Sequence, residues 1–102
     1  FADCHIPMDE CLTRAAVDLS GRGYFVWSAP AMTETVGGLD TEIFPEFFRA
    51  FASNAKMALH LSVLYGTNTH HMIESAFKAT ARAILAAKAV TGDSLPSTKG
   101  VL

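Results

Sequence analysis

The chain has 102 residues, of which 50% are apolar and 18% charged, and its formal net charge is -2. This composition predicts one folded domain over residues 1–102 and excludes both a disordered chain and a basic surface that binds nucleic acid. A domain of this length buries only a modest core and is often stabilised by assembly. The high apolar content therefore favours a homo-oligomer.

The sequence lacks the signals of membrane insertion and secretion, and its two cysteines follow no known site pattern. No apolar run approaches the ~18 residues of a membrane span, and the first residues, FADCHIPMDE, lack the basic and apolar regions of a secretion signal. Cys4 and Cys11 fit neither a zinc-site spacing nor a disulfide framework. We expect a cytoplasmic protein with free thiols and no membrane partner.

Two strands are predicted near the start of the chain. Residues 12–19 alternate imperfectly between apolar and polar side chains, and residues 24–27 form a second apolar run. Residues 20–23, SGRG, are typical of a turn. The pattern predicts neighbouring strands joined by this short turn.

The segments on either side of these strands are less regular. Residues 1–6 precede Pro7 and are predicted to form a further edge strand. Residues 28–40 contain a proline and a glycine pair, so we expect a loop there.

The first predicted helix runs from Thr41 or Pro45 to Ala55. One face carries aromatic residues at helical spacing, and the opposite face is polar and includes Glu46. The aromatic positions are Phe44, Phe47, Phe48 and Phe51.

A third strand and a second helix complete the expected fold. Residues 57–65 alternate in a way that predicts a strand covered on both faces, with His60 in a core or an interface. The second helix is predicted to begin after Asn68 or Thr69, either of which can cap it, and to stop at Gly92. It is expected to direct an apolar stripe, Ile73, Ala76, Phe77, Thr80, Ile84 and Ala87, toward the core. The fold class is therefore α+β, with about four mostly antiparallel strands backed by two helices.

The stretch TNTHHMIESAFK opens the second helix. On a helix, His70 and Glu74 are four residues apart, His71 and Glu74 are three apart, and Glu74 and Lys78 are again four apart. Side chains at these spacings are neighbours on the helix surface, so the pattern predicts a single polar stripe. The positive end of the helix dipole is expected to keep both imidazoles neutral. Two neutral imidazoles and a carboxylate are suitable ligands for Mn, Fe, Zn, Co or Ni.

The spacing alone leaves a metal site and a solvated helix start both open. In the second case the histidines would cap carbonyl groups, and Glu74 would pair with Lys78 for only a few tenths of a kcal/mol. One helix supplies at most three ligands, so a complete site needs another element or subunit. Glu46 is one candidate for a further ligand, and an ordinary exposed glutamate is the alternative.

A second set of side chains has the chemistry of a phosphate site. Arginine forks, lysine ammonium groups and hydroxyls bind phosphate monoesters. The candidates lie in turn-like segments and on the second helix, and the alternative is that they are scattered surface charges. They are Arg22, Lys78, Ser97 and Lys99.

Four segments in the same order resemble the C-terminal half of the imidazoleglycerol-phosphate dehydratase family. They are PMDECLTRAAVDLSGRGY, LDTEIFPEFFRAFASNAKMALHL, YGTNTHHMIESAFKATARA and LPSTKGVL, and together they cover nearly the whole chain. The resemblance implies one half-repeat of a ribosomal protein S5 domain 2-like fold. It also implies a hydro-lyase of histidine biosynthesis that converts imidazole glycerol phosphate to imidazole acetol phosphate.

The resemblance implies a role for each candidate residue. His70, His71 and Glu74 correspond to metal ligands, with Glu46 as a weaker match, and Asp9 corresponds to an acidic residue near the substrate. Glu74, His71 and Asp9 are therefore the expected catalytic residues, and the four phosphate candidates correspond to the family's phosphate site. The implied cofactor is Mn²⁺, with two ions per full-length family subunit.

The same resemblance implies partners that this sequence does not contain. Family chains are about twice as long, and the N-terminal half, with its own histidine pair, is absent here. The implied assembly is a 24-mer built from trimers, in which both halves and neighbouring subunits complete each metal site. The chain is thus expected to need its N-terminal half, and a folded assembly module that is inactive by itself is the alternative. One local departure is Gly23, where the family usually has proline.

Overall fold

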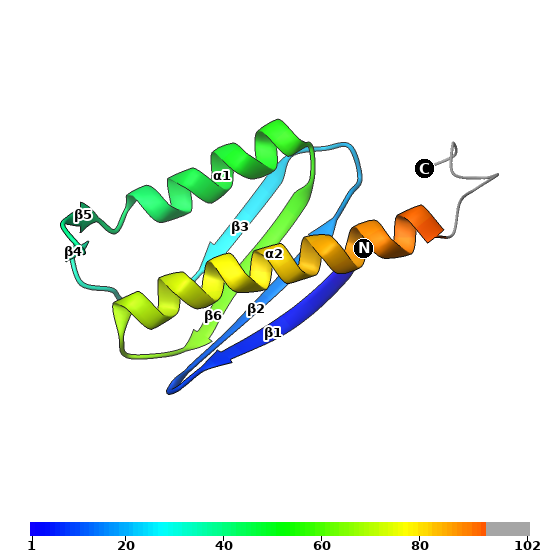
Figure 1. The fold of residues 1–102 in the computed structure, drawn as a ribbon. Helices are drawn as coiled ribbons and strands as arrows, with labels where there is room; N and C mark the ends of the chain where they lie inside the picture. The colour runs from blue at the N-terminus through cyan, green and yellow to red at the C-terminus, as the bar shows by residue number, and fades with distance from the viewer. Residues whose placement is uncertain (94–102) are drawn as a thin grey trace.

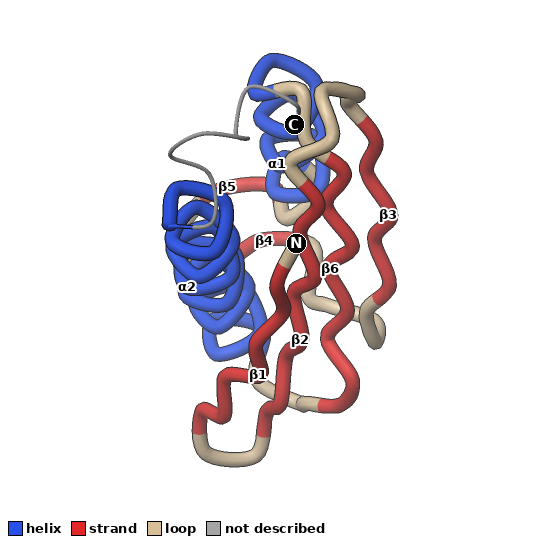
Figure 2. The backbone as a smooth tube through the Cα atoms, turned by 90° about the vertical axis from the view of Figure 1, so that its right-hand side faces the viewer, coloured by secondary structure: helices blue, strands red, loops and turns tan. Residues whose placement is uncertain are grey.

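In the computed structural model, which describes residues 1–93, both long helices lie on the same face of one sheet (Figures 1 and 2). The sheet strands are β1 (Ala2–Met8), β2 (Cys11–Asp18), β3 (Tyr24–Ser28) and β6 (Ala58–Tyr65). The helices are α1 (Ile43–Ala55) and α2 (Thr69–Asp93). The predicted α+β class with four strands and two helices is therefore confirmed.

The strand order is β1-β2-β6-β3, and only the β3–β6 pair is parallel. The predicted pairing of the two strands around SGRG is wrong, because β6 lies between them. The segment between β2 and β3 passes over the start of β6 and is hydrogen-bonded to it. The Gly21 N–H donates to the Lys56 carbonyl, and the Tyr24 N–H donates to the Met57 carbonyl. The short hairpin is instead at Asp9 and Glu10, between β1 and β2.

Two smaller differences concern the flanking segments. The predicted edge strand is confirmed and continues through Pro7 to Met8, which an edge position permits because proline has no N–H to donate. The segment predicted as a loop contains a small antiparallel pair, β4 (Thr35–Val36) and β5 (Leu39–Asp40), closed by Gly37 and Gly38.

The sheet has one covered face and one open face. Leu59, Leu61 and Val63 are buried under the helices, whereas His60 and Leu64 on the same strand are exposed. The prediction that this strand is covered on both faces is therefore wrong for the chain by itself. Of the two places expected for His60, a core or an interface, the core is excluded by its exposure. Figure 2 shows the reason, since both helices lie on one side of the sheet.

Small side chains set the distance between α2 and the sheet. Four alanines on one face of α2 are completely buried against β1, β2 and β6, so the helix backbone lies close to the strands. They are Ala76, Ala79, Ala83 and Ala87. Helix α2 contains Gly92 and ends one residue beyond it, a difference within the usual uncertainty of helix ends.

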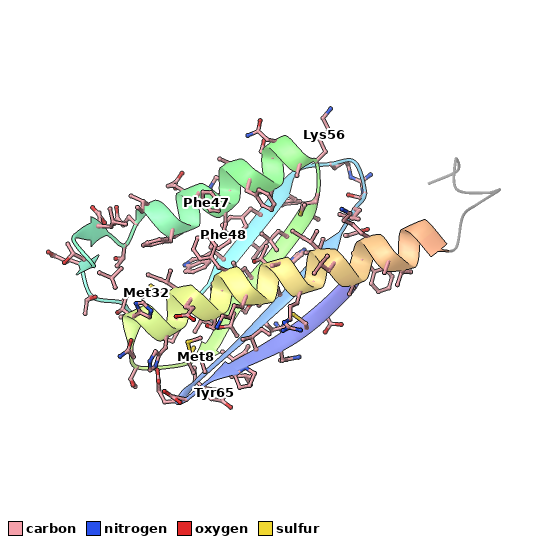
Figure 3. The ribbon with its side chains drawn as sticks, in the orientation of Figure 1. Met8, Met32, Phe47, Phe48, Lys56 and Tyr65 are labelled. Carbon is pink, nitrogen blue, oxygen red and sulfur yellow. The ribbon has the colours of Figure 1, made fainter. Side chains whose placement is uncertain are left out.

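The two helices meet through aromatic rings, since the Phe77 ring of α2 lies 5.5 Å and 4.7 Å from the Phe47 and Phe48 rings of α1, between centroids, but they leave space beside this contact. Of the aromatic residues on α1 only Phe48 is fully buried, and Phe77 of α2, predicted to be a core residue, is partly exposed. A hollow of about 330 Å³ lies between the helices, and Phe47 and Phe48 border it (Figure 3). Within the aromatic stripe, Phe48 is buried against the sheet, and Phe47 and Phe51 line this hollow.

Both cysteines are free thiols, as predicted. The Cys4 thiol donates to the Ala79 carbonyl at 3.1 Å, and burial raises its pKa. Cys11 is buried beside the Ser75 hydroxyl. Among residues 1–93, no helix is both long enough and apolar enough to cross a membrane.

Gly23 lies against the end of α1, which yields a prediction about stability. A Cβ atom at this position would be 2.7 Å from the Ser53 Cα atom, so Gly23→Ala must displace backbone. We expect it to lower the free energy of unfolding by about 1–3 kcal/mol. Urea denaturation measures the change, with Ser28→Ala at the exposed end of β3 as control. Equal stabilities of the two variants would contradict the prediction.

Candidate functional site

The start of α2 is fixed by a side-chain cap. The Asn68 Oδ1 atom accepts a hydrogen bond from the His71 backbone N–H at 3.0 Å, so Asn68 rather than Thr69 caps the helix. The Thr69 hydroxyl instead accepts two hydrogen bonds from Thr33, one from its backbone N–H at 3.0 Å and one from its hydroxyl at 3.1 Å. These bonds tie the 29–42 segment to the helix start. The backbone that carries both histidines is therefore held from two sides.

The floor beneath the helix start is apolar. Buried Cys11, Val63 and Met72 form a small cluster, against which Met8 and Met32 pack (Figure 3). These contacts bring the β1–β2 hairpin and the 29–42 segment to the same end of the molecule as the histidine pair.

His70, Glu74 and Lys78 form the predicted stripe along α2. His70 Nε2 lies 2.9 Å from Glu74 Oε1, and Lys78 Nζ donates to Glu74 Oε2 at 2.8 Å. The Lys78 ammonium, followed by the His70 ring, lowers the pKa of Glu74. Glu74 is therefore ionised at neutral pH and shared between an imidazole and an ammonium group.

His71 leaves this stripe and turns toward the β1–β2 hairpin. Consecutive helical residues point roughly 100° apart, so the two rings cannot share one direction. His71 Nδ1 lies 2.7 Å from Glu10 Oε1, and Asp9 Oδ2 lies 3.9 Å from His71 Nε2. The predicted convergence on one stripe is thus correct for His70, Glu74 and Lys78 and wrong for His71.

Glu10 is a site residue that the sequence reasoning missed. Its second oxygen, Oε2, accepts hydrogen bonds from the backbone N–H groups of Thr67 and Asn68, both at 2.9 Å. Glu10 and His71 are 61 residues apart in sequence. The only available signal was the adjacency of Glu10 to the candidate Asp9, since no local periodicity links a hairpin to a distant helix.

Carboxylates control the protonation of His71. The hydrogen bonds from the His71 ring and from two backbone N–H groups lower the pKa of Glu10 to about 2. The bond to Glu10, and secondarily the charges of Asp9 and Glu74, raise the pKa of His71. The helix dipole was expected to favour the neutral ring, but for His71 these carboxylates act in the opposite direction and raise its pKa.

A hollow opens beside the other histidine. It measures about 290 Å³ and is bordered by the β4–β5 segment and by the starts of both helices. Its lining is mostly apolar, with His70 and Glu74 as the polar members. A small ligand in this space would reach an imidazole and a carboxylate at once.

The remaining candidates are not brought to the histidines. Glu46 is near the start of α1, at the same end of the molecule, but its side chain is 72% exposed and its neighbour is Arg49 at 4.0 Å. Arg22 follows the far end of β2, roughly 25 Å along the strand from the hairpin. Ser97 and Lys99 lie outside the described residues.

The donor chemistry suits a divalent cation but is divided into two parts. Imidazole and carboxylate are ligands that Mn²⁺ accepts. Among residues 1–93, however, no group of three or more His, Cys, Asp or Glu side chains is arranged to hold a metal ion. His70 with Glu74 is one partial set, and His71 with the neighbouring Asp9 is another. Each would need ligands from elsewhere to complete a coordination sphere.

The fold and these two partial sets define a class of protein: a two-layer α+β domain with paired imidazole and carboxylate side chains at one end of its sheet. A family model for imidazoleglycerol-phosphate dehydratase matches residues 1–84. Proteins of this name from Granulibacter bethesdensis and Phenylobacterium zucineum are each 52% identical to this chain over its whole length. One from Lacticaseibacillus casei is 50% identical.

Solved structures give the same result. The structure of the dehydratase from Staphylococcus aureus aligns with a TM-score of 0.79 and 48% identity, covering 81% of this chain and 48% of that one. The enzyme from Pyrococcus furiosus, in complex with (S)-C348, aligns with a TM-score of 0.73 and 30% identity, covering 82% and 47%. The chain belongs to the imidazoleglycerol-phosphate dehydratase family. It spans about half the length of its curated relatives, 54% for the three named above.

The Glu10–His71 pair predicts a pH dependence of stability in the metal-free protein. Stabilisation by ionised Glu10 is complete above its usual pKa of 4.5 and is lost as the pH falls through about 2. Stabilisation by protonated His71 is complete below its usual pKa of 6.5 and is lost as the pH rises through the raised value. The pair therefore stabilises the fold most between pH 4.5 and 6.5.

Urea denaturation with a chelator present tests this window. Glu10→Gln should lower the free energy of unfolding most within it and less at alkaline pH. Glu34→Gln, at an exposed glutamate, should show no such dependence. A loss for Glu10→Gln that stays constant from the window to alkaline pH would contradict the prediction.

Proposed function

We propose that this chain is the C-terminal half of a manganese-dependent imidazoleglycerol-phosphate dehydratase. The reaction would remove water from imidazole glycerol phosphate to give imidazole acetol phosphate in histidine biosynthesis. The observation that carries the proposal is the 52% identity over the whole chain to proteins of this name. The donor chemistry at the start of α2 is consistent with it.

His70, His71, Glu74 and Glu46 are the proposed metal ligands. A bound Mn²⁺ would act as a Lewis acid that withdraws electron density from the substrate's imidazole ring. The arrangement of His70 beside Glu74, with His71 turned away, is consistent with the two histidines serving different ions. For Glu46 the support is weaker, because within the chain it faces only Arg49.

Protein side chains would move the protons of the dehydration. Breaking a C–H bond and a C–O bond requires one group to accept a proton and another to protonate the departing hydroxyl. The carboxylates of Asp9 and Glu74 are the groups that could take the proton from carbon and return one to the departing hydroxyl, whereas His71 would act as a ligand of the metal. These three are the proposed catalytic residues.

Lys78 would bind the substrate phosphate together with Arg22, Ser97 and Lys99. Its ammonium group is held by Glu74 and half exposed, so a phosphate oxygen can share it. Because Arg22 lies at the far end of the sheet, we assign it to the phosphate site of a neighbouring subunit. Such sharing fits a homo-oligomer, which we propose to be a 24-mer built from trimers.

The N-terminal half of the enzyme is the proposed partner of this chain. The open sheet face exposes Tyr24, Val26 and Leu64, which favours association over an isolated existence. The second candidate function, a folded assembly module that is inactive by itself, is supported by the lack of any three-ligand cluster within residues 1–93. The free Cys4 and Cys11 fit a reducing, cytoplasmic location.

Mixing the halves tests the catalytic role. We expect no turnover of imidazole glycerol phosphate by this chain alone. Turnover should appear after it is mixed with the N-terminal half of the Granulibacter bethesdensis relative and Mn²⁺, and a chelator should abolish it. Formation of imidazole acetol phosphate measures both results. An assembled but inactive mixture would favour the assembly module.

Two substitutions separate metal binding from phosphate binding in that assembly. His71→Ala should remove the Mn²⁺ ion that His71 binds, and activity with it, because a ligand is lost. Lys78→Ala should keep Mn²⁺ and raise KM by about tenfold or more, because a charge-assisted hydrogen bond to phosphate is lost. Elemental analysis and steady-state kinetics provide the two readouts.

The exposed edge-strand histidine offers the matched control for those variants. His5→Ala should change neither the metal content nor the kinetics. A His71→Ala protein with as much Mn²⁺ as the His5→Ala protein would rule out the ligand role of His71.

A further inference from the structure

Glu10 divides its two oxygens between two tasks. Oε1 is 2.7 Å from His71 Nδ1, and Oε2 accepts the backbone N–H groups of Thr67 and Asn68 at 2.9 Å each. The two backbone bonds fix the position of the carboxylate, so the oxygen that meets the ring is itself held in place. This carboxylate is anchored on the turn before α2, independently of the ring.

The contact also decides which ring nitrogen of His71 remains available. An ionised carboxylate only accepts hydrogen bonds, so Nδ1 must carry the proton in the neutral ring. The lone pair of the neutral ring then lies on Nε2, the nitrogen that faces Asp9 at 3.9 Å. A carboxylate that binds one imidazole nitrogen in this way orients the other toward a metal in many metalloproteins.

We propose that Glu10 is a positioning residue, which holds the His71 ring in the Nδ1–H tautomer and presents Nε2 to a divalent cation. The inference rests on the proposed metal site and adds to it a residue that touches neither metal nor substrate. It also gives the β1–β2 hairpin, which carries Asp9, a second role.

A merely structural role for Glu10 predicts different results. The bonds from Oε2 tie the hairpin to the helix start and would stabilise the fold whether or not His71 binds a metal. Loss of stability after substitution therefore cannot separate the two roles. The tautomer of His71 and the affinity of the folded protein for Mn²⁺ can.

The first measurement needs no substitution at Glu10. Solid-state ¹⁵N NMR of metal-free, histidine-labelled assembly at alkaline pH distinguishes protonated Nδ1 from protonated Nε2. The signals of His71 are assigned by their loss in His71→Ala. Protonated Nδ1 supports the proposal, and protonated Nε2 overturns it.

The second measurement is a titration of the assembled protein with Mn²⁺ alone, followed by the electron paramagnetic resonance of the free ion. Glu10→Gln keeps the size of the side chain, but its amide has only one oxygen that accepts hydrogen bonds, so it cannot accept from both His71 and the backbone N–H groups. The substitution should weaken Mn²⁺ binding about 10- to 100-fold. Glu34→Gln, the same change at an exposed glutamate, should bind like the parent. A Glu10→Gln affinity equal to that of Glu34→Gln would overturn the proposal.

His71→Ala in the same titration separates this inference from the proposed function. If His71→Ala loses Mn²⁺ while Glu10→Gln does not, the positioning role is wrong and the metal site stands. If neither variant loses Mn²⁺, both proposals are wrong. If both lose it while circular dichroism shows native folding, both are supported.

Discussion

The close approach of α2 to the sheet is the constraint on which the candidate site depends. Buried alanines along one face of the helix let its backbone pack directly on the strands. A rotation of the helix would turn larger side chains toward the strands, where there is no space for them. With the helix fixed, the direction of each side chain in its first turn is fixed as well. His70 must then face the β4–β5 segment, and His71 must face the hairpin.

The two histidines therefore lie in different surroundings, although they are adjacent in sequence. His70 shares Glu74 with Lys78 and borders a mostly apolar hollow. His71 lies among Asp9, Glu10 and the backbone of the turn. A negative environment around one imidazole and a shared carboxylate beside the other are both surroundings that favour positive charge, and neither forms a complete metal site within residues 1–93.

The sequence predicted the features that depend on local periodicity. The α+β class, both helices, the edge strand and the stripe of His70, Glu74 and Lys78 follow from spacing along a strand or helix. The features that depend on long-range pairing were not predicted. The insertion of β6 between β2 and β3 follows from backbone bonds of residues 20–24 to the start of a distant strand. The role of Glu10 follows from a contact between hairpin and helix, and no pattern within either segment contains it.

The hairpin itself has a consequence for how this end of the molecule tolerates change. Its loop is only two residues long, and Asp9 has a left-handed backbone with φ of 50°. Lengthening the loop by one residue would reverse the faces of β1 relative to β2 or rotate both acids away from the imidazole. An insertion that most surface loops absorb freely should therefore disturb the contact of this hairpin with His71.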